Sequence, residues 1–176
     1  MKAMIIVMQG LEECEALLTY DLLYRAGIEV DLVSDSDMVT SSRNVTFKPH
    51  RLLKDIDPDE YDCLILPGGI PGTNNLENSE TVQHLIDDFV SKDKYIAAIC
   101  AAPSILLHKG LLENGKFTCH PGFESGYEPL NEKAVVDGRF ITGKGVGAVF
   151  EFAKLIITAL LGEEKAEEIM RKTQYY

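Results

Sequence analysis

Short apolar runs alternate with longer polar segments along most of the chain. The runs read "AMIIVM", "IEVDLVS", "CLILP", "YIAAI" and "RFITG", at residues 3–8, 28–34, 63–67, 95–99 and 139–143. Runs of this length bounded by turn residues predict β-strands. Strands that are apolar almost throughout are typical of a parallel sheet covered by helices on both faces.

Helical patterns lie between these predicted strands. In residues 79–92, "SETVQHLIDDFVSK", the apolar side chains recur at the spacing of one helix face, and Ser79 is placed to cap the start. Residues 13–26 and 147–161 are also predicted to be helical. Alternating strands and helices predict an α/β fold with a doubly wound, mostly parallel sheet.

Length and charge narrow the class of protein. A chain of 176 residues with 45% hydrophobic residues suits one domain, and we expect a single domain over residues 1–176. The net charge of -11 argues against a nucleic-acid partner, because such binding depends on lysine and arginine. No apolar stretch is long enough for a membrane span, and the N-terminus is unlike a signal peptide, so we expect a cytoplasmic protein with no membrane partner.

The cysteines are scattered, without the spacing of a zinc site or a C-x-x-C pair. They are Cys14, Cys63, Cys100 and Cys119. For a chain without a secretion signal, reduced thiols are the expected state, and no metal site is predicted.

Functional residues are expected at the loops that follow the strands, because doubly wound sheets bind ligands beyond the carboxyl ends of their strands. The relevant loops read "QGLEECEA", "PGGIPGTNN", "CAAP" and "GKGVGAV". The last lacks the G-x-G-x-x-G spacing of a dinucleotide site, and the second lacks the lysine of a P-loop. We therefore predict no nucleotide cofactor.

Cys100 lies where a predicted strand turns abruptly into a helix, with Pro103 in the first helical turn. A sharp turn of this kind presents the nucleophile in α/β hydrolases, and the next backbone N–H helps to bind an oxyanion. A position before a helix also favours the thiolate. The alternative is an inert cysteine that packs as a small hydrophobe.

Glu15, Gly69 and His120 are further candidates. Gly68 and Gly69 follow a strand directly, so an N–H there is available as a second oxyanion donor, although a plain tight turn explains them too. Glu15 follows the first strand, where it is either a helix-dipole partner or, beside Cys100, a protonated carboxyl group that moves protons. A histidine near a thiol acts as base or orienter, and His120 alone follows a strand-like segment rather than a polar surface.

Together, "GLEECEALLTYDLLYRAGIEV", "SSRNVTF", "LILPGG", "AAICAAPSILL", "FTCHPG" and "ITGKGVGAVFEFA" resemble the ThiJ/PfpI superfamily, and within it the DJ-one branch, in order and spacing. The resemblance implies a flavodoxin-like fold, a homodimer and no cofactor. It implies that Cys100 is the reactive cysteine, that Glu15 hydrogen-bonds it and that His120 lies nearby.

The same resemblance assigns further positions. Gly69 and Ala101 match the backbone N–H groups of an anion pocket, and Arg25 and Arg43 match arginines near the dimer interface and the pocket mouth. The peptidase members of the superfamily place an acidic residue after their histidine. Here Pro121 follows instead, which argues against an intracellular cysteine peptidase.

The resemblance implies a cysteine-dependent glyoxalase III or deglycase that acts on small reactive carbonyls such as methylglyoxal and glyoxal. The alternative is an oxidative-stress sensor or chaperone-like protein that uses oxidation of Cys100 with little catalysis. Both hypotheses need a reactive thiol. A scaffold with an inert Cys100 is the third possibility.

Overall fold

The computed structural model describes residues 1–176 and contains a seven-stranded sheet in the order β5-β2-β1-β6-β7-β9-β8. The strands are β1 (Lys2–Ile6), β2 (Glu29–Ser34), β5 (Arg51–Leu52), β6 (Cys63–Leu66), β7 (Tyr95–Ile99), β8 (Ala134–Asp137) and β9 (Phe140–Gly143). Every pairing in this sheet is parallel except that of β8 with β9. The predicted doubly wound, flavodoxin-like α/β fold is confirmed.

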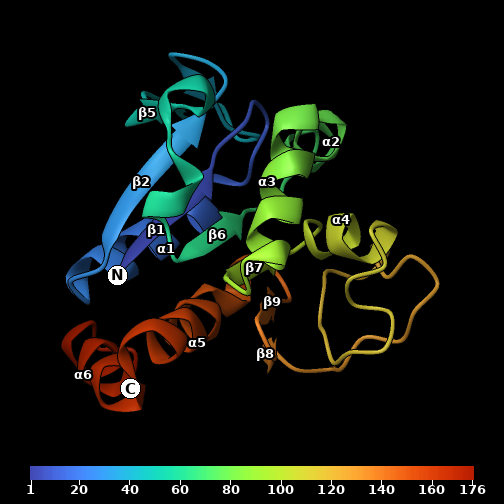
Figure 1. Cartoon of the computed structure of the whole chain (residues 1–176). Coiled ribbons are helices and arrows are strands. Elements are labelled where there is room, and N and C mark those ends of the chain that lie inside the picture. Colours follow the sequence, from blue (N-terminus) through green and yellow to red (C-terminus); the bar gives the residue numbers. More distant parts are fainter.

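Helices cover both faces of the sheet (Figure 1). They are α1 (Glu13–Arg25), α2 (Gly72–Asn78), α3 (Glu80–Ser91), α4 (Pro103–His108), α5 (Val149–Leu161) and α6 (Glu163–Lys172). One apolar core contains residues of α1, α5 and α6, and a second contains residues of α2, α3 and α4. Strand β1 shows why the strands are apolar throughout: Ala3 and Ile5 enter the first core, and Met4 and Ile6 enter the second.

Several short or peripheral elements add to the predicted pattern. An antiparallel hairpin of β3 (Val39–Thr40) and β4 (Thr46–Phe47) lies outside the main sheet. Helix α6 follows α5 directly after Gly162 and packs on it (Figure 1). No helix is both long enough and apolar enough to cross a bilayer. All four cysteines are free.

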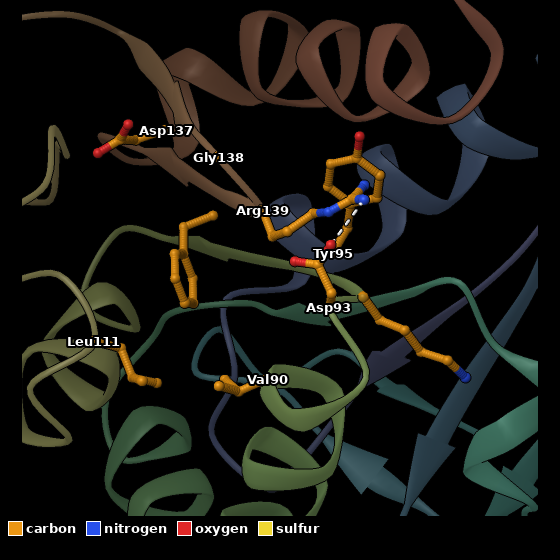
Figure 2. Close-up of a pocket in the computed structure, with 9 residues that line it drawn as sticks. Val90, Asp93, Tyr95, Leu111, Asp137, Gly138 and Arg139 are labelled. Atoms are coloured by element: carbon orange, nitrogen blue, oxygen red, sulfur yellow. Dashed lines mark hydrogen bonds and ion pairs between the residues drawn. The ribbon is translucent and has the colours of Figure 1, made fainter.

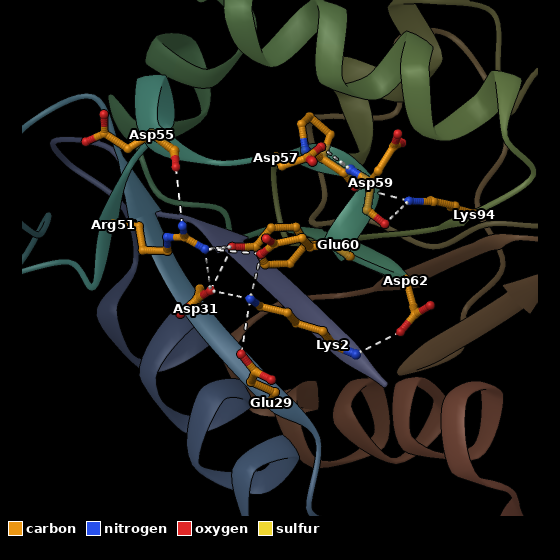
Figure 3. A network of polar contacts seen from close by, with 12 residues as sticks. Lys2, Glu29, Asp31, Arg51, Asp55, Asp57, Asp59, Glu60, Asp62 and Lys94 are labelled. Carbon is orange, nitrogen blue, oxygen red and sulfur yellow. Dashed lines mark hydrogen bonds and ion pairs between the residues drawn. The ribbon is translucent and has the colours of Figure 1, made fainter.

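A polar network ties together the amino ends of the strands (Figure 3). The Lys2 ammonium lies 3.1 Å from Glu29, 3.4 Å from Asp31 and 3.0 Å from Glu60. It also lies 4.7 Å from the centre of the buried Tyr61 ring, whose hydroxyl donates to Asp31 at 2.7 Å. These contacts occupy the end of the sheet opposite to the loops in which functional residues are predicted.

Candidate active site

Cys100 forms the turn between β7 and α4 in a conformation that few residues adopt. Its φ is +66°, in the left-handed region, and such backbone strain is concentrated at functional sites. Two backbone hydrogen bonds hold it there: the Cys100 N–H donates to the Gly143 carbonyl of β9 at 2.9 Å, and the Cys100 carbonyl accepts from the His120 N–H at 2.8 Å. Pro103 opens α4, as predicted.

A cavity of about 350 Å³ lies over this turn at the carboxyl edge of the sheet. It is lined by Glu12, Glu15, Ser42, Arg43, Gly69, Ile70, Cys100, Ala101, His120, Phe123 and Val146. All the predicted site residues except one therefore meet at a single cavity.

Arg25 is the exception. It ends α1, its side chain is exposed, and its Nε lies 2.6 Å from Asp21. Arg25 does not line the cavity, because its side chain projects from the surface. Its proposed place at a dimer interface stays a prediction.

Glu15 is a buried carboxyl group beside the thiol. The first turn of α1 places it there with only 1% of its surface exposed, and Oε2 accepts a hydrogen bond from the Gly68 N–H at 2.9 Å. Its other oxygen, Oε1, is buried without a partner of ordinary hydrogen-bond geometry. Burial raises the pKa of Glu15 from 4.5 to about 7, so the group keeps a proton near neutral pH.

The thiol of Cys100 has a raised pKa rather than the lowered one expected of a cysteine before a helix. Burial and the charge of Glu15 raise this pKa to about 12, whereas the N–H groups of Ala101 and Gly69 act in the opposite direction. A proton on Glu15 removes the carboxylate charge and supplies a donor to the sulfur. The two groups therefore ionise as a pair, and the thiolate is favoured when Glu15 is protonated.

We predict that Glu15 makes stability depend on pH. Between pH 4.5 and about 7 the unfolded chain loses a proton that folded Glu15 keeps. This difference lowers the free energy of unfolding by about 3 kcal/mol as pH rises through that window. In Glu15→Gln the contribution is absent, while the glutamine oxygen remains able to accept from Gly68.

Urea unfolding of wild type and Glu15→Gln at about pH 5 and about pH 8 measures the effect. The variant should gain stability relative to wild type at the higher pH. An equal difference at both values would contradict a raised pKa.

Two glycines allow the close approach of these groups. A Cβ on Gly68 would lie 2.6 Å from Cys100 Cβ and 2.8 Å from Glu15 Oε2. Gly69 has a φ of +91°, and a Cβ there would lie 2.3 Å from the Glu12 backbone nitrogen. Glycine is therefore required at both positions, and a plain tight turn does not explain the pair.

We predict that Gly69→Ala destabilises the protein well beyond the effect of backbone conformation alone. Gly27 is the matched control, because its φ is +87° and nothing lies within 4 Å of its Cβ position. Gly27→Ala should lose about 1–2 kcal/mol through the left-handed conformation. Gly69→Ala should lose at least about 1 kcal/mol more, since the Glu12 backbone must move. Equal losses in urea unfolding would show that the close contact carries no energy.

His120 is exposed at the mouth of the cavity. Its Nδ1 lies 2.9 Å from the Pro121 carbonyl, which only accepts hydrogen bonds, so Nδ1 carries a proton. In the neutral ring, Nε2 is then free to accept a proton. The ring also meets Phe123 edge-on, with centroids 6.1 Å apart.

Sequence reasoning missed several lining residues. Glu12 caps α1 by accepting from the Cys14 N–H at 3.4 Å. It also faces the cavity, and its charge raises the pKa of Glu15. Ile70 and Val146 lie in two of the loops that were predicted to carry functional residues. In those loops only the glycines were considered as candidates. Phe123 follows His120 closely, and no pattern in the sequence marks it.

The largest hollow of the molecule, about 730 Å³, lies at the other end of the strands (Figure 2). There Arg139 pairs with Asp93 at 3.1 Å and lies over the ring of Tyr95, with Val90 and Leu111 on another side. It contains no thiol or histidine. Size alone therefore does not identify the reactive site. Nowhere does the structure gather three or more His, Cys, Asp or Glu side chains into a cluster able to hold a metal ion.

Known proteins resemble this chain over nearly its whole length. The model of the DJ-1/PfpI family matches residues 1–159. The Drosophila melanogaster protein dj-1beta is 35% identical over 96% of this chain and 94% of its own. The Caenorhabditis elegans protein named glutathione-independent glyoxalase DJR-1.2 is 34% identical over 91% of this chain and 88% of its own.

A solved structure described as oxidised Toxoplasma gondii DJ-1 superposes with a TM-score of 0.93 and 31% identity, covering 98% of this chain and 97% of that one. The sequence comparisons and the structural superposition therefore indicate the same family. The chain belongs to the DJ-1/PfpI family.

Proposed function

We propose that this protein is a cofactor-free, cysteine-dependent glyoxalase that converts small α-oxoaldehydes such as methylglyoxal and glyoxal to α-hydroxy acids. One observation carries the proposal: the strained turn at Cys100 holds the sulfur between two backbone N–H donors and a buried carboxyl group whose pKa is raised to about 7. The name of the Caenorhabditis elegans relative supports it.

In the first step the Cys100 sulfur adds to the aldehyde carbon. One proton is shared between Cys100 and Glu15, and the thiolate forms when that proton lies on Glu15. As the sulfur adds, Glu15 passes the proton to the former aldehyde oxygen, which gives a hemithioacetal and leaves Glu15 as the carboxylate. The N–H groups of Gly69 and Ala101 interact with the sulfur, and we assign to them the stabilisation of the developing oxyanion.

In the second step a proton moves from the former aldehyde carbon to the neighbouring ketone carbon. The aldehyde carbon is oxidised to a thioester and the ketone is reduced to an alcohol, so no outside oxidant or reductant is needed. Glu15, as the carboxylate, is the base that we assign to this transfer. Water then cleaves the thioester, releasing the hydroxy acid and regenerating the thiol. We assign to His120, which lines the cavity, the role of orienting or activating that water.

The test is the formation of lactate from methylglyoxal in buffer free of glutathione, other thiols and amines. Product is followed because any thiol traps the aldehyde reversibly. Protein whose thiols have been alkylated with iodoacetamide is the blank. Catalytic lactate from the native protein and none from the blank is the expected result, and native protein that forms no lactate beyond one equivalent would overturn the proposal.

Deglycation of early carbonyl adducts on proteins uses the same thiol chemistry and the same residues. It differs in the substrate, which carries the carbonyl carbon on a side-chain nitrogen or sulfur. Release of free lysine derivatives from a pre-formed methylglyoxal adduct, in the presence of excess glyoxal scavenger, separates direct deglycation from removal of free aldehyde.

A second candidate function is oxidation sensing through Cys100. The observation that favours it is the Glu15 carboxyl group, which interacts with the Cys100 thiol and has one buried oxygen, Oε1, without a hydrogen-bond partner. When protonated, this group would donate a hydrogen bond to a sulfinate on Cys100. Mass spectrometry after mild peroxide treatment should find two added oxygens on Cys100, and fewer on the other cysteines. A sensor retains folding and gains a partner or conformation on oxidation, whereas the enzyme loses turnover.

Peptidase activity receives no support from the site, because His120 Nδ1 bonds the main-chain carbonyl of Pro121 and not an acidic side chain. As expectations that accompany the proposal, the protein acts in the cytoplasm in stress protection and forms a homodimer. Sedimentation velocity tests the last of these directly.

A further inference from the structure

The cavity over Cys100 is much larger than the substrates named so far. Its volume of about 350 Å³ falls in the range of about 300–1,000 Å³ that is typical of sites for drug-sized ligands. Glyoxal and methylglyoxal have only two and three carbon atoms, so each fills a small part of it. The remaining walls therefore have room for a larger substituent.

One side of the remaining wall is polar, with Glu12, Ser42 and Arg43, and the rest is apolar. Ile70 comes from the loop after β6, Phe123 from the segment after His120, and Val146 from the loop after β9. Ile70 is 48% exposed and Val146 is 54% exposed, although large aliphatic side chains are normally covered. We call Ile70, Phe123 and Val146 the apolar rim.

A second hollow continues from the rim. It has a volume of about 330 Å³, shares His120 and Val146 with the first cavity, and is also lined by Pro121 and Ala148. Lys133 and Lys144 also line this hollow, but their ammonium groups contact other residues. Lys133 pairs with Glu151, and Lys144 Nζ donates to Asn131 at 2.6 Å. Their alkyl stems are thus left to line the hollow.

We propose that the site favours α-oxoaldehydes whose ketone carbon carries an apolar aryl or branched alkyl group. This inference rests on the proposed glyoxalase function. With the aldehyde carbon at Cys100, the substituent on the ketone carbon extends over the apolar rim toward the second hollow. Water is displaced from exposed apolar surface as it binds, which favours the larger substrate.

Phenylglyoxal is a suitable probe. Its isomerisation and hydration give mandelate, by the same transfer of one proton between adjacent carbons and the addition of one water. No group is lost and no oxidant is consumed. Initial rates are needed because oxoaldehydes also modify arginine side chains.

The experiment compares kcat/KM for phenylglyoxal and glyoxal, measured as mandelate and glycolate. We expect the ratio to favour phenylglyoxal at least about tenfold in wild type, in line with the contribution of an apolar group to specificity. Val146→Ala and Phe123→Ala should each lower the ratio severalfold. Val136→Ala is the matched control, because Val136 is 48% exposed on β8 and lines neither hollow, and its ratio should equal that of wild type.

A second measurement does not depend on turnover. Mandelate should protect Cys100 from alkylation by iodoacetamide at a concentration about tenfold lower than lactate does, and the difference should shrink in Val146→Ala. Failure of the proposed function appears as no turnover of either aldehyde. The present inference is overturned when glyoxal is turned over as well as phenylglyoxal, or when mandelate and lactate protect equally.

Discussion

Replacing Cys100 by serine should lower the formation of lactate from methylglyoxal by at least about a thousandfold, to the level of the blank. The reason is chemical rather than structural. Serine has nearly the shape of cysteine and fits the same turn at φ +66°, but its hydroxyl is far less acidic than a thiol. Near neutral pH the carboxyl group of Glu15 is too weak a base to ionise it. The hemithioacetal, on which every later step depends, cannot form.

The matched control for this variant is Cys14→Ser. Cys14 is an exposed cysteine in α1 that does not line the cavity. Lactate should form at the wild-type rate in Cys14→Ser, and circular dichroism should show that both variants are folded. Retention of more than about a tenth of the activity in Cys100→Ser would remove the thiol from the mechanism.

Replacing Glu15 by glutamine should lower turnover by about 10²–10⁴-fold, the usual contribution of a general acid–base group. Glutamine keeps an acceptor for the Gly68 N–H and adds no volume, so the neighbouring backbone is retained. It has no proton to favour the thiolate and no basic oxygen to carry a proton between the two carbons.

Two readouts separate this chemical role from loss of structure. Titration with an aromatic disulfide reagent in denaturant and in buffer shows whether Cys100 is intact and accessible. Incorporation of solvent deuterium at the hydroxyl-bearing carbon of lactate shows whether a protein group exchanges the moving proton. If Glu15→Gln kept the wild-type kcat, another base would have to transfer the proton between the two carbons. His120 is the next candidate.

The fold could be predicted from the sequence because a strand that is buried on both faces appears in the sequence as a run of apolar residues. Strands β6 and β7 are apolar throughout and β1 is apolar after Lys2, since alternate side chains enter the two cores. This apolar pattern is absent from elements that bury only one face or only a few side chains. In α6 only Ala166, Ile169 and Met170 are buried among charged residues, and β8 lies at the edge of the sheet with Val136 exposed.

The site residues that could be predicted from the sequence are those whose position is fixed by the backbone. Cys100 and Gly69 occupy turns that follow strands, and a turn in a parallel sheet places its residue at a known edge. The direction of a side chain over that edge is a tertiary property. Arg25 projects to solvent and Phe123 turns into the cavity, and neither outcome has a local signal. The raised pKa of Cys100 likewise depends on burial by residues distant in sequence.

The order of the strands also means that the site is assembled late in synthesis. Strand β7 is neighboured by β6, made earlier, and by β9, which is the last strand of the chain. Until β9 leaves the ribosome, the Cys100 N–H has no Gly143 carbonyl to bond and Val146 is missing from the cavity. A nascent or truncated chain that ends before residue 140 therefore carries an ordinary thiol on an unfinished sheet. The strained turn and the cavity around Cys100 thus take their final form only when the chain is nearly complete.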